Sequence, residues 1–264
     1  MRFDVITLFP ELFAPFLSAG INRRAFETGA VELKLWQLRD YADGTYRRVD
    51  DRPFGGGPGM VLLAEPLEKC LQAIRHDRAL KNPYEKPVPV VLFSPIGQPL
   101  NHAGVEEWSQ SDGAILICGR YEGLDQRFID AHVDVQVSLG DFVLSGGEIA
   151  AIALLDAVAR LQPGVLNDEG SHQMDSFNPA LDGLLDCGHF TRPEVWKDIT
   201  VPPVLMSGHH AEITKWRRQQ SLVLTQKYRP DLIVGARLAG KLSTQDENFL
   251  FSLSASGLVE FKSN

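Results

Sequence analysis

Two glycine-rich segments limit the structures that this chain of 264 residues can adopt. In the first, residues 53–60 hold four glycines and two prolines, which excludes the interior of a helix or a strand. The second, residues 139–148, leads into an apolar stretch at 149–161 that we expect to be a buried helix. Backbone groups beside the start of a helix commonly hold small polar ligands. We therefore expect both segments to be loops and the second to border a ligand site.

The composition is that of a globular protein, with 44% hydrophobic and 23% charged residues. No apolar run approaches the roughly 18 residues that a membrane helix needs. Residues 1–13 lack the basic start and cleavage site of a signal peptide. The three cysteines, Cys70, Cys118 and Cys187, are scattered and odd in number, unlike a disulfide framework or a metal cluster. We expect a cytoplasmic protein that does not bind membranes.

The charge pattern argues against a protein that coats nucleic acid, because the formal net charge is −8. Two local clusters of basic residues stand out: Arg47, Arg48 and Arg52 near the first glycine-rich segment, and Lys215, Arg217 and Arg218 around Trp216. A solvated face explains either cluster as well as a phosphate-binding patch does, and the residues leave both interpretations open.

The hydrophobic pattern predicts an α/β fold with a mostly parallel sheet. Apolar or alternating runs predict strands at 3–8, 31–36, 88–93, 114–118 and 133–137. Helices are predicted at 66–74, 105–109 and 149–161. Strands that alternate with helices indicate a parallel sheet covered on both faces.

The composition of the sequence changes after residue 161, where polar residues, glycines and prolines predominate up to about residue 178. We predict an α/β domain at 1–165, a flexible linker at 166–178 and a smaller, mainly helical domain at 179–264. Helices are expected there at 212–228, 231–238 and 244–253.

Several motifs occur together in one order along the chain: residues 50–60, 94–97, 119–123, 140–148, 175–177, 184–187, 191–195 and 202–205. In these motifs the chain resembles the bacterial tRNA (guanine-N1)-methyltransferases of the SPOUT class, from residue 1 to about 228. The resemblance implies a deep trefoil knot in the α/β domain, which general rules of chain threading would not predict. It also implies a tRNA-binding C-terminal domain and a homodimer with the active site at the subunit interface.

The resemblance further implies transfer of a methyl group from S-adenosylmethionine (SAM) to N1 of guanosine 37 in tRNA. That nitrogen carries a proton at neutral pH, so the reaction needs a general base and a cation near O6. The resemblance assigns these roles to Asp175 and Arg160. The sequence alone favours a turn-capping role for Asp175 and a helix-dipole role for Arg160, and only the resemblance favours catalysis.

The resemblance places the cofactor in three loops, whose glycines would also serve simply to turn the chain. The expected cofactor-binding residues are Leu92, Phe93, Ser94, Pro95, Gly97, Gly119, Tyr121, Glu122, Ser138, Leu139, Gly140, Asp141, Phe142, Val143, Leu144, Gly146 and Gly147. The resemblance further implies that Glu122 faces either the methionine amino group of SAM or a Mg²⁺ ion.

The residues expected to contact tRNA are Arg47, Arg48, Asp50, Arg52, Gly59, Lys215, Arg217 and Arg218. Segment 168–174 is expected to close over the site when tRNA binds. Two alternatives stay open: a SPOUT methyltransferase with another target nucleotide, and a non-catalytic RNA-binding module on the same fold.

Overall fold

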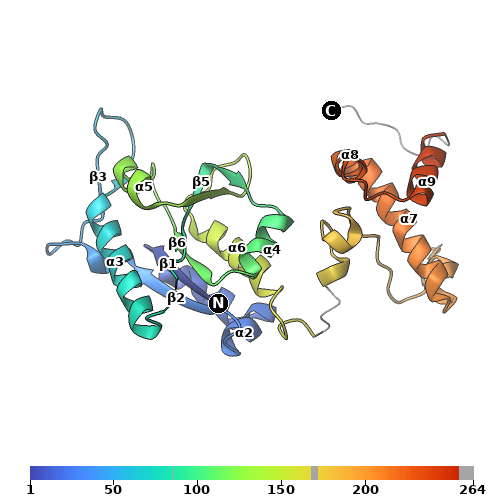
Figure 1. Ribbon diagram of the computed structural model, residues 1–264, viewed down its shortest axis with the longest axis horizontal. Helices are drawn as coiled ribbons and strands as arrows, with labels where there is room; N and C mark the ends of the chain where they lie inside the picture. The colour runs from blue at the N-terminus through green and yellow to red at the C-terminus, as the bar shows by residue number, and fades with distance from the viewer. Residues whose placement is uncertain (85, 168–171, 256–264) are drawn as a thin grey trace. The chain divides into compact units, whose positions relative to one another are not determined.

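The structure is a computed structural model that describes residues 1–84, 86–167 and 172–255 (Figure 1). The chain divides into two compact units, Met1–Asn167 and Asp168–Asn264, here called the N-terminal unit and the C-terminal unit. Among the helices of the described residues, none has the length and apolar content needed to span a bilayer.

A five-stranded sheet with every pairing parallel forms the centre of the N-terminal unit. Its order is β2 (Glu32–Gln37), β1 (Arg2–Thr7), β6 (Gly113–Ile117), β5 (Val90–Pro99) and β7 (Val135–Ser138). Each strand overlaps one of the five predicted runs, so the predicted parallel α/β sheet is confirmed. The central strands β1 and β6 are buried throughout, as expected of strands covered on both faces.

Helices cover both faces of this sheet. On one face, α2 (Gly20–Glu27), α4 (His102–Ser109) and α6 (Glu148–Ala159) pack against Phe3 and Val5 of β1. On the other, α3 (Ala64–Lys81) and α5 (Gln126–His132) pack against Ile6. The alternation follows from the strand geometry, which points successive side chains to opposite faces.

Several elements differ from the sequence prediction. The helix predicted at 66–74 extends over the 18 residues of α3, and α1 (Ala14–Ser18), α2 and α5 were not predicted. Strand β5 continues past the predicted end at residue 93, with a register shift between Phe93 and Gln98. This irregularity carries residues 94–97 out of the regular ladder, beside the end of β7.

A buried charge network joins β1 to α3 at the start of the strand. The Asp4 carboxylate is fully buried and accepts hydrogen bonds from Arg2 at 2.6 Å, Arg78 at 2.5 Å and the Trp36 indole at 2.8 Å. Arg2 also donates to Asp77 at 2.7 Å. Because a buried charge is tolerated only when it is paired, this network fixes α3 against the sheet.

The C-terminal unit is built around α7 (His210–Tyr228), α8 (Pro230–Leu238) and α9 (Thr244–Ala255). Leu184, Leu222, Ile233 and Leu250 form its buried core. It also contains η3 (His172–Met174), η4 (Pro179–Leu181), η5 (Pro203–Met206) and a hairpin of β8 (Val195–Trp196) and β9 (Ile199–Thr200).

The predicted linker at 166–178 is only partly covered, because residues 168–171 lie outside the described residues. Its last residues are bonded within the C-terminal unit. The backbone N–H of Phe177 donates to the Leu184 carbonyl at 2.8 Å, and the Ser176 hydroxyl accepts from the N–H of Asp186 at 2.9 Å. Residues 176 and 177 are therefore anchored rather than free.

Candidate functional site

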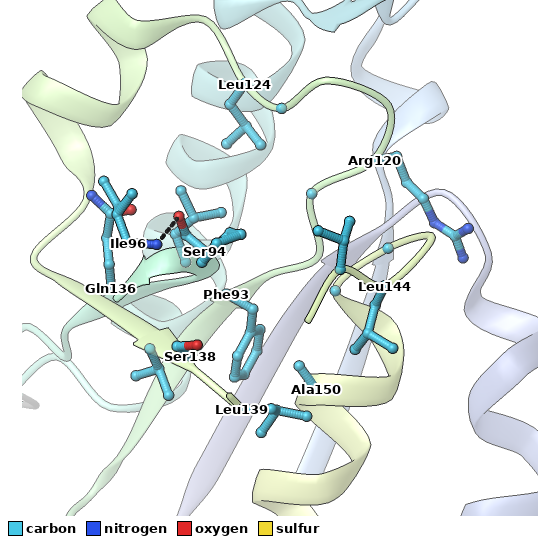
Figure 2. A pocket seen from close by; sticks show the side chains of 18 of the residues that line it. Phe93, Ser94, Ile96, Arg120, Leu124, Gln136, Ser138, Leu139, Leu144 and Ala150 are labelled. Carbon is cyan, nitrogen blue, oxygen red and sulfur yellow. Dashed lines mark hydrogen bonds between the residues drawn. The ribbon is translucent and has the colours of Figure 1, made fainter. Parts of the chain in front are cut away.

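A pocket of about 420 Å³ opens at the carboxyl ends of β5, β6 and β7. Its walls are the irregular end of β5, the loop after β6 and the loop from β7 to α6 (Figure 2). The carboxyl edge of a parallel sheet is the usual place for a ligand site in an α/β fold, because loops rather than helices close the structure there.

The pocket brings together most of the residues predicted to hold the cofactor. Those that line it are Leu92, Phe93, Ser94, Pro95, Gly119, Tyr121, Glu122, Ser138, Leu139, Gly140, Phe142, Val143, Leu144, Gly146 and Gly147. Gly97 and Asp141 do not line it. A side chain on Gly97 would overlap the backbone of Val137, and Asp141 is exposed, so one faces the sheet and the other faces solvent.

Three further lining residues lie within the expected cofactor loops: Ile96, Arg120 and Ser145. The lining residues that were not predicted are Gly123, Leu124, Gln126, Ile129, Gln136, Val137 and Ala150. Arg120 and Ser145 lie inside two of the motifs, so the motifs themselves were the signal. Gln126 and Ile129 come from α5, whose short apolar pattern did not reveal a helix.

The interior of the pocket combines apolar side chains with backbone polar groups. Phe93, Leu139 and Leu144 point into it (Figure 2). The two serine hydroxyls nearby are hydrogen-bonded to backbone groups. The Ser94 hydroxyl accepts from the N–H of Ile96 at 3.4 Å, and the Ser138 hydroxyl accepts from the N–H of Gly140 at 3.1 Å. Such a surface can hold a flat heterocycle between apolar groups while backbone atoms read its edge.

Close backbone packing brings together two walls of the pocket, the loop after β6 and the loop from β7 to α6. The N–H of Gly147 donates to the carbonyl of Gly119 at 3.0 Å. A Cβ on Gly147 would come within 2.8 Å of the Cys118 Cα, closer than real Cβ atoms approach. Glycine at 147 is therefore needed for the contact that closes the pocket.

A buried ion pair lies behind these walls. Glu148, the first residue of α6, is 1% exposed, and its Oε1 accepts from the Thr7 hydroxyl at 2.8 Å. Its Oε2 is 2.9 Å from Nη2 of Arg120, and Nη1 of Arg120 donates to the Ser145 carbonyl at 3.1 Å. The carboxylate also lies at the helix N-terminus, where the helix dipole favours negative charge.

The first glycine-rich segment borders the same pocket. It leaves β3 (Asp50–Asp51) and returns through β4 (Val61–Leu62). The Met60 carbonyl accepts from the N–H of Glu122 at 3.0 Å, and the N–H of Leu62 donates to the Gly123 carbonyl at 2.9 Å. These bonds attach the segment to the loop after β6, so Gly59 lies against the Glu122 side chain.

The basic residues near this segment are exposed, and the guanidinium groups of Arg47 and Arg48 are paired with nearby acids. Arg47 binds Asp40 at 2.7 Å, and Arg48 binds Asp51 at 2.8 Å. The N–H of Arg52 donates to the Asp51 carboxylate at 2.7 Å. Exposed pairs of this kind are weak and exchange readily with other anions.

In the C-terminal unit the three basic residues of the second cluster differ in their exposure to solvent. Lys215 and Arg217 are exposed on α7. Arg218 is instead three-quarters buried, bound to Asp182 at 2.8 Å and to Asp246 at 3.0 Å. Its charge is neutralised within the unit, so the prediction that Arg218 follows tRNA phosphates does not suit its position.

The two proposed catalytic residues belong to different units. Arg160 is half-buried at the end of α6 in the N-terminal unit, and its N–H donates to the Asp156 carbonyl. Asp175 is half-buried directly after η3 in the C-terminal unit, and its N–H donates to the His172 carbonyl. The side chain that caps η4 is that of Asn178, which accepts from the N–H of Ala180 at 2.9 Å.

A metal site is not preformed in the part of the chain that the structure describes. No group of three or more His, Cys, Asp or Glu side chains gathers there as a ligand set. Glu122 would thus need ligands from a bound substrate or from water to hold a Mg²⁺ ion.

Comparison with known proteins identifies relatives along nearly the whole chain. A family model described as tRNA (guanine-1)-methyltransferase TrmD matches residues 1–235. A tRNA (guanine-N(1)-)-methyltransferase of a Polaromonas species is 70% identical over 253 residues, covering 96% of this chain and 97% of the relative. Another, from Paracidovorax citrulli, is 66% identical over 254 residues, covering 96% of this chain and 99% of the relative.

Proposed function

The chain belongs to the tRNA (guanine-1)-methyltransferase family, and from this premise we propose that it transfers a methyl group from SAM to N1 of guanosine 37 in tRNA. One observation supports the reaction above all others. The first glycine-rich segment, which would receive the guanosine, is hydrogen-bonded through Met60 to Glu122 on the rim of the pocket that would hold the methyl donor.

The pocket suits SAM in size and chemistry. Its volume of about 420 Å³ lies in the range of small-molecule sites. Phe93, Leu139 and Leu144 offer apolar contact for the adenine, and the backbone around Gly140 and Gly147 offers polar contact for its edge and for the ribose. When bound, SAM would supply a methyl group on a sulfonium, which departs as a neutral thioether, so no nucleophilic side chain is needed.

The acceptor nitrogen must lose its proton before it can be methylated. In this proposal the Asp175 carboxylate takes the proton from N1, while Arg160 stabilises the negative charge that develops on O6. A positioned general base contributes about 10²–10⁴ in rate, and a cation near the oxyanion adds to that. Glu122 on the pocket rim would be the contact for a Mg²⁺ ion.

The tRNA would be held by both units. To reach the pocket, guanosine 37 must leave its stack, which costs a few kcal/mol. Arg47 and Arg48 could exchange their exposed acid partners for phosphates, and the exposed Arg52 could bind a further phosphate, with Asp50 and Gly59 against the extruded base. Lys215 and Arg217 would follow the backbone from α7. The net charge of −8 makes such local patches necessary for binding RNA.

The proposal includes a homodimer in the cytoplasm, with the active site at the subunit interface. Large apolar side chains are exposed around the start of α6 and on the helical turn η1 (Pro10–Phe13) that contacts it: Leu12, Phe142, Val143 and Ile149. Apolar surface of this kind favours association. The proposal also includes the trefoil knot of the SPOUT class, supported by the contact of segment 139–147 with the loop after β6.

The test is methyl transfer from labelled SAM to two tRNA transcripts that differ only at position 37. We expect a transcript with guanosine to gain a methyl group at N1, and one with adenosine to gain none. Equal labelling of both, or a methyl group on a ribose, would favour a SPOUT methyltransferase with another target. Absence of SAM binding would favour the non-catalytic RNA-binding module.

A further inference from the structure

We propose that Glu148, together with Thr7 and the pocket-lining Arg120, forms a brace that holds the cofactor pocket in its binding shape. In this role Glu148 is a positioning residue, because it is not among the residues that line the pocket. The inference rests on the proposed function, since it assigns to these residues an effect on SAM binding.

The brace is a buried pair of opposite charges with a hydroxyl beside it. Glu148 is 1% exposed, and its two carboxylate oxygens face two different elements. Oε1 accepts from Thr7 at the end of β1, and Oε2 lies 2.9 Å from the Arg120 guanidinium after β6. A buried carboxylate is costly unless it is paired, so the start of α6 is held where both partners can reach it.

Arg120 transmits this constraint to the pocket wall. Its guanidinium lies apart from Phe93 and Leu144 in Figure 2, beside the loop that leads into α6. There it donates to the Ser145 carbonyl at 3.1 Å and stacks on the Phe9 ring at 4.4 Å from the centroid. A side chain on Gly146 would overlap this guanidinium, so loop and arginine are in close contact.

These contacts hold the loop after β6 and the loop from β7 to α6, two of the three pocket walls, at a fixed separation. The Gly119 carbonyl accepts from the N–H of Gly147, the residue directly before Glu148. If the carboxylate lost its charge, Arg120 would keep a buried charge without a counter-ion and would turn toward water. The loop at 144–147 would then be released from the end of β6, and the pocket would widen.

A general loss of stability has to be separated from a loss of pocket shape, and the chain offers a matched control. Asp77 binds Arg2 and Lys34, each at 2.7 Å, near the start of β1. That is the opposite end of the sheet from Thr7 and the pocket. Asp77→Asn removes the same charge as Glu148→Gln and weakens the same unit without touching the brace.

The experiment measures the SAM dissociation constant by calorimetry and the melting temperature of the full chain for wild type, Glu148→Gln and Asp77→Asn. We expect both variants to melt at a lower temperature. Glu148→Gln should bind SAM about tenfold more weakly, because a buried charge-assisted contact is lost. Asp77→Asn should bind within about twofold of wild type, since distant sites are independent.

Steady-state kinetics give a second readout. Glu148→Gln should raise KM for SAM, while kcat at saturating SAM stays within about threefold of wild type, because the brace acts on binding and not on the reacting atoms. A fall in kcat with unchanged KM would overturn the assignment.

Should Glu148→Gln fail to fold, Thr7 keeps the proposal testable. Thr7→Ser preserves the hydroxyl that binds Glu148 and the N–H of Phe9, whereas Thr7→Val removes it with little change of shape. We expect weaker SAM binding from Thr7→Val and near wild-type binding from Thr7→Ser. Equal affinity of these two variants, or of Glu148→Gln and wild type, overturns the brace. A wild-type protein that does not bind SAM contradicts the proposed function itself.

Discussion

The backbone N–H of Glu122 donates a hydrogen bond to the carbonyl of Met60 at 3.0 Å, joining the first glycine-rich segment to the rim of the pocket. Gly59, one residue earlier, has a φ of +82°, and a Cβ there would overlap the Glu122 side chain. A side chain at position 59 would therefore strain the backbone and displace the exposed Glu122 side chain.

Gly59→Ala is therefore expected to displace Glu122 and to lower kcat/KM for tRNA by about tenfold or more. Gly55→Ala is the matched control, because its φ of +86° imposes similar backbone strain while no atom lies within 4 Å of the added Cβ. Methyl-transfer kinetics of both variants provide the measurement. Equal losses would show that strain in the segment, rather than contact with Glu122, controls activity.

Asp175→Asn tests the proposed base. The amide cannot accept the N1 proton, so we expect methyl transfer to fall by about 10²–10⁴ while SAM binding is retained. Single-turnover transfer and SAM calorimetry measure the two quantities. Asp182→Asn, which weakens an ion pair with Arg218 in the same unit, serves as control and should retain transfer. Loss of SAM binding in Asp175→Asn would contradict a role confined to proton removal.

The Arg218–Asp246 pair should make the C-terminal unit sensitive to acid. Burial alone would raise the pKa of Asp246, but hydrogen bonds from Arg218 and Ser243 outweigh it and hold this pKa below the ordinary value of 3.8. A lowered folded-state pKa stabilises the fold above the unfolded pKa, and the contribution disappears as the pH falls through the folded pKa.

Asp246→Asn is accordingly expected to cost about 2 kcal/mol of unfolding free energy at pH 6, and less as the pH falls below about 4. Denaturant unfolding followed by the tryptophans of the C-terminal unit, Trp196 and Trp216, measures this. Asp231→Asn breaks an exposed pair with Arg229 and should cost about 0–1 kcal/mol. A difference between wild type and Asp246→Asn that stays constant from pH 6 to 3 would exclude the Asp246 carboxylate as its source.

The thiols of the N-terminal unit should be inert in the folded protein. Burial raises the pKa of Cys70 to about 12 and raises the pKa of Cys118 well above its ordinary value. Because the thiolate is the reactive form, iodoacetamide at pH 8 should leave both residues unmodified until urea unfolds the chain. Mass spectrometry after timed quenching measures the modification. Rapid labelling of Cys118 under native conditions would show that the end of β6 opens readily.

The proposed dimer predicts a difference between two equally exposed apolar residues. Ile149 on α6 is 54% exposed and Val234 on α8 is 52% exposed. Ile149→Asp should shift the protein to monomer and abolish methyl transfer, because a charge would be buried in the interface. Val234→Asp should leave the mass in solution unchanged. Sedimentation or light scattering decides between them, and a wild-type monomer would refute the dimer outright.

Much of the fold followed from local pattern. The five strand cores were predictable because four of them are apolar runs and the edge strand β2 alternates apolar and polar residues. The loops were predictable because glycine and proline exclude other structure. The short helices α1, α2 and α5 were not predicted, because five to eight residues contain too few turns to show a hydrophobic period of 3.6 residues. The motifs located the cofactor loops. They did not predict that Asp141 is exposed to solvent or that Gln126 lines the pocket.

The sequence by itself determined the strand cores, the longer helices, the glycine-rich loops and the family, because these depend on residues close together in the chain or on motifs in fixed order. Only the tertiary structure decided which charges meet. Thr7 and Glu148 bond across 141 residues, and Arg218 turns inward to Asp246 rather than outward to solvent. The topology of the sheet and the cost of burying an unpaired charge decide which residues become partners of this kind. Neither can be predicted from a local segment of the sequence.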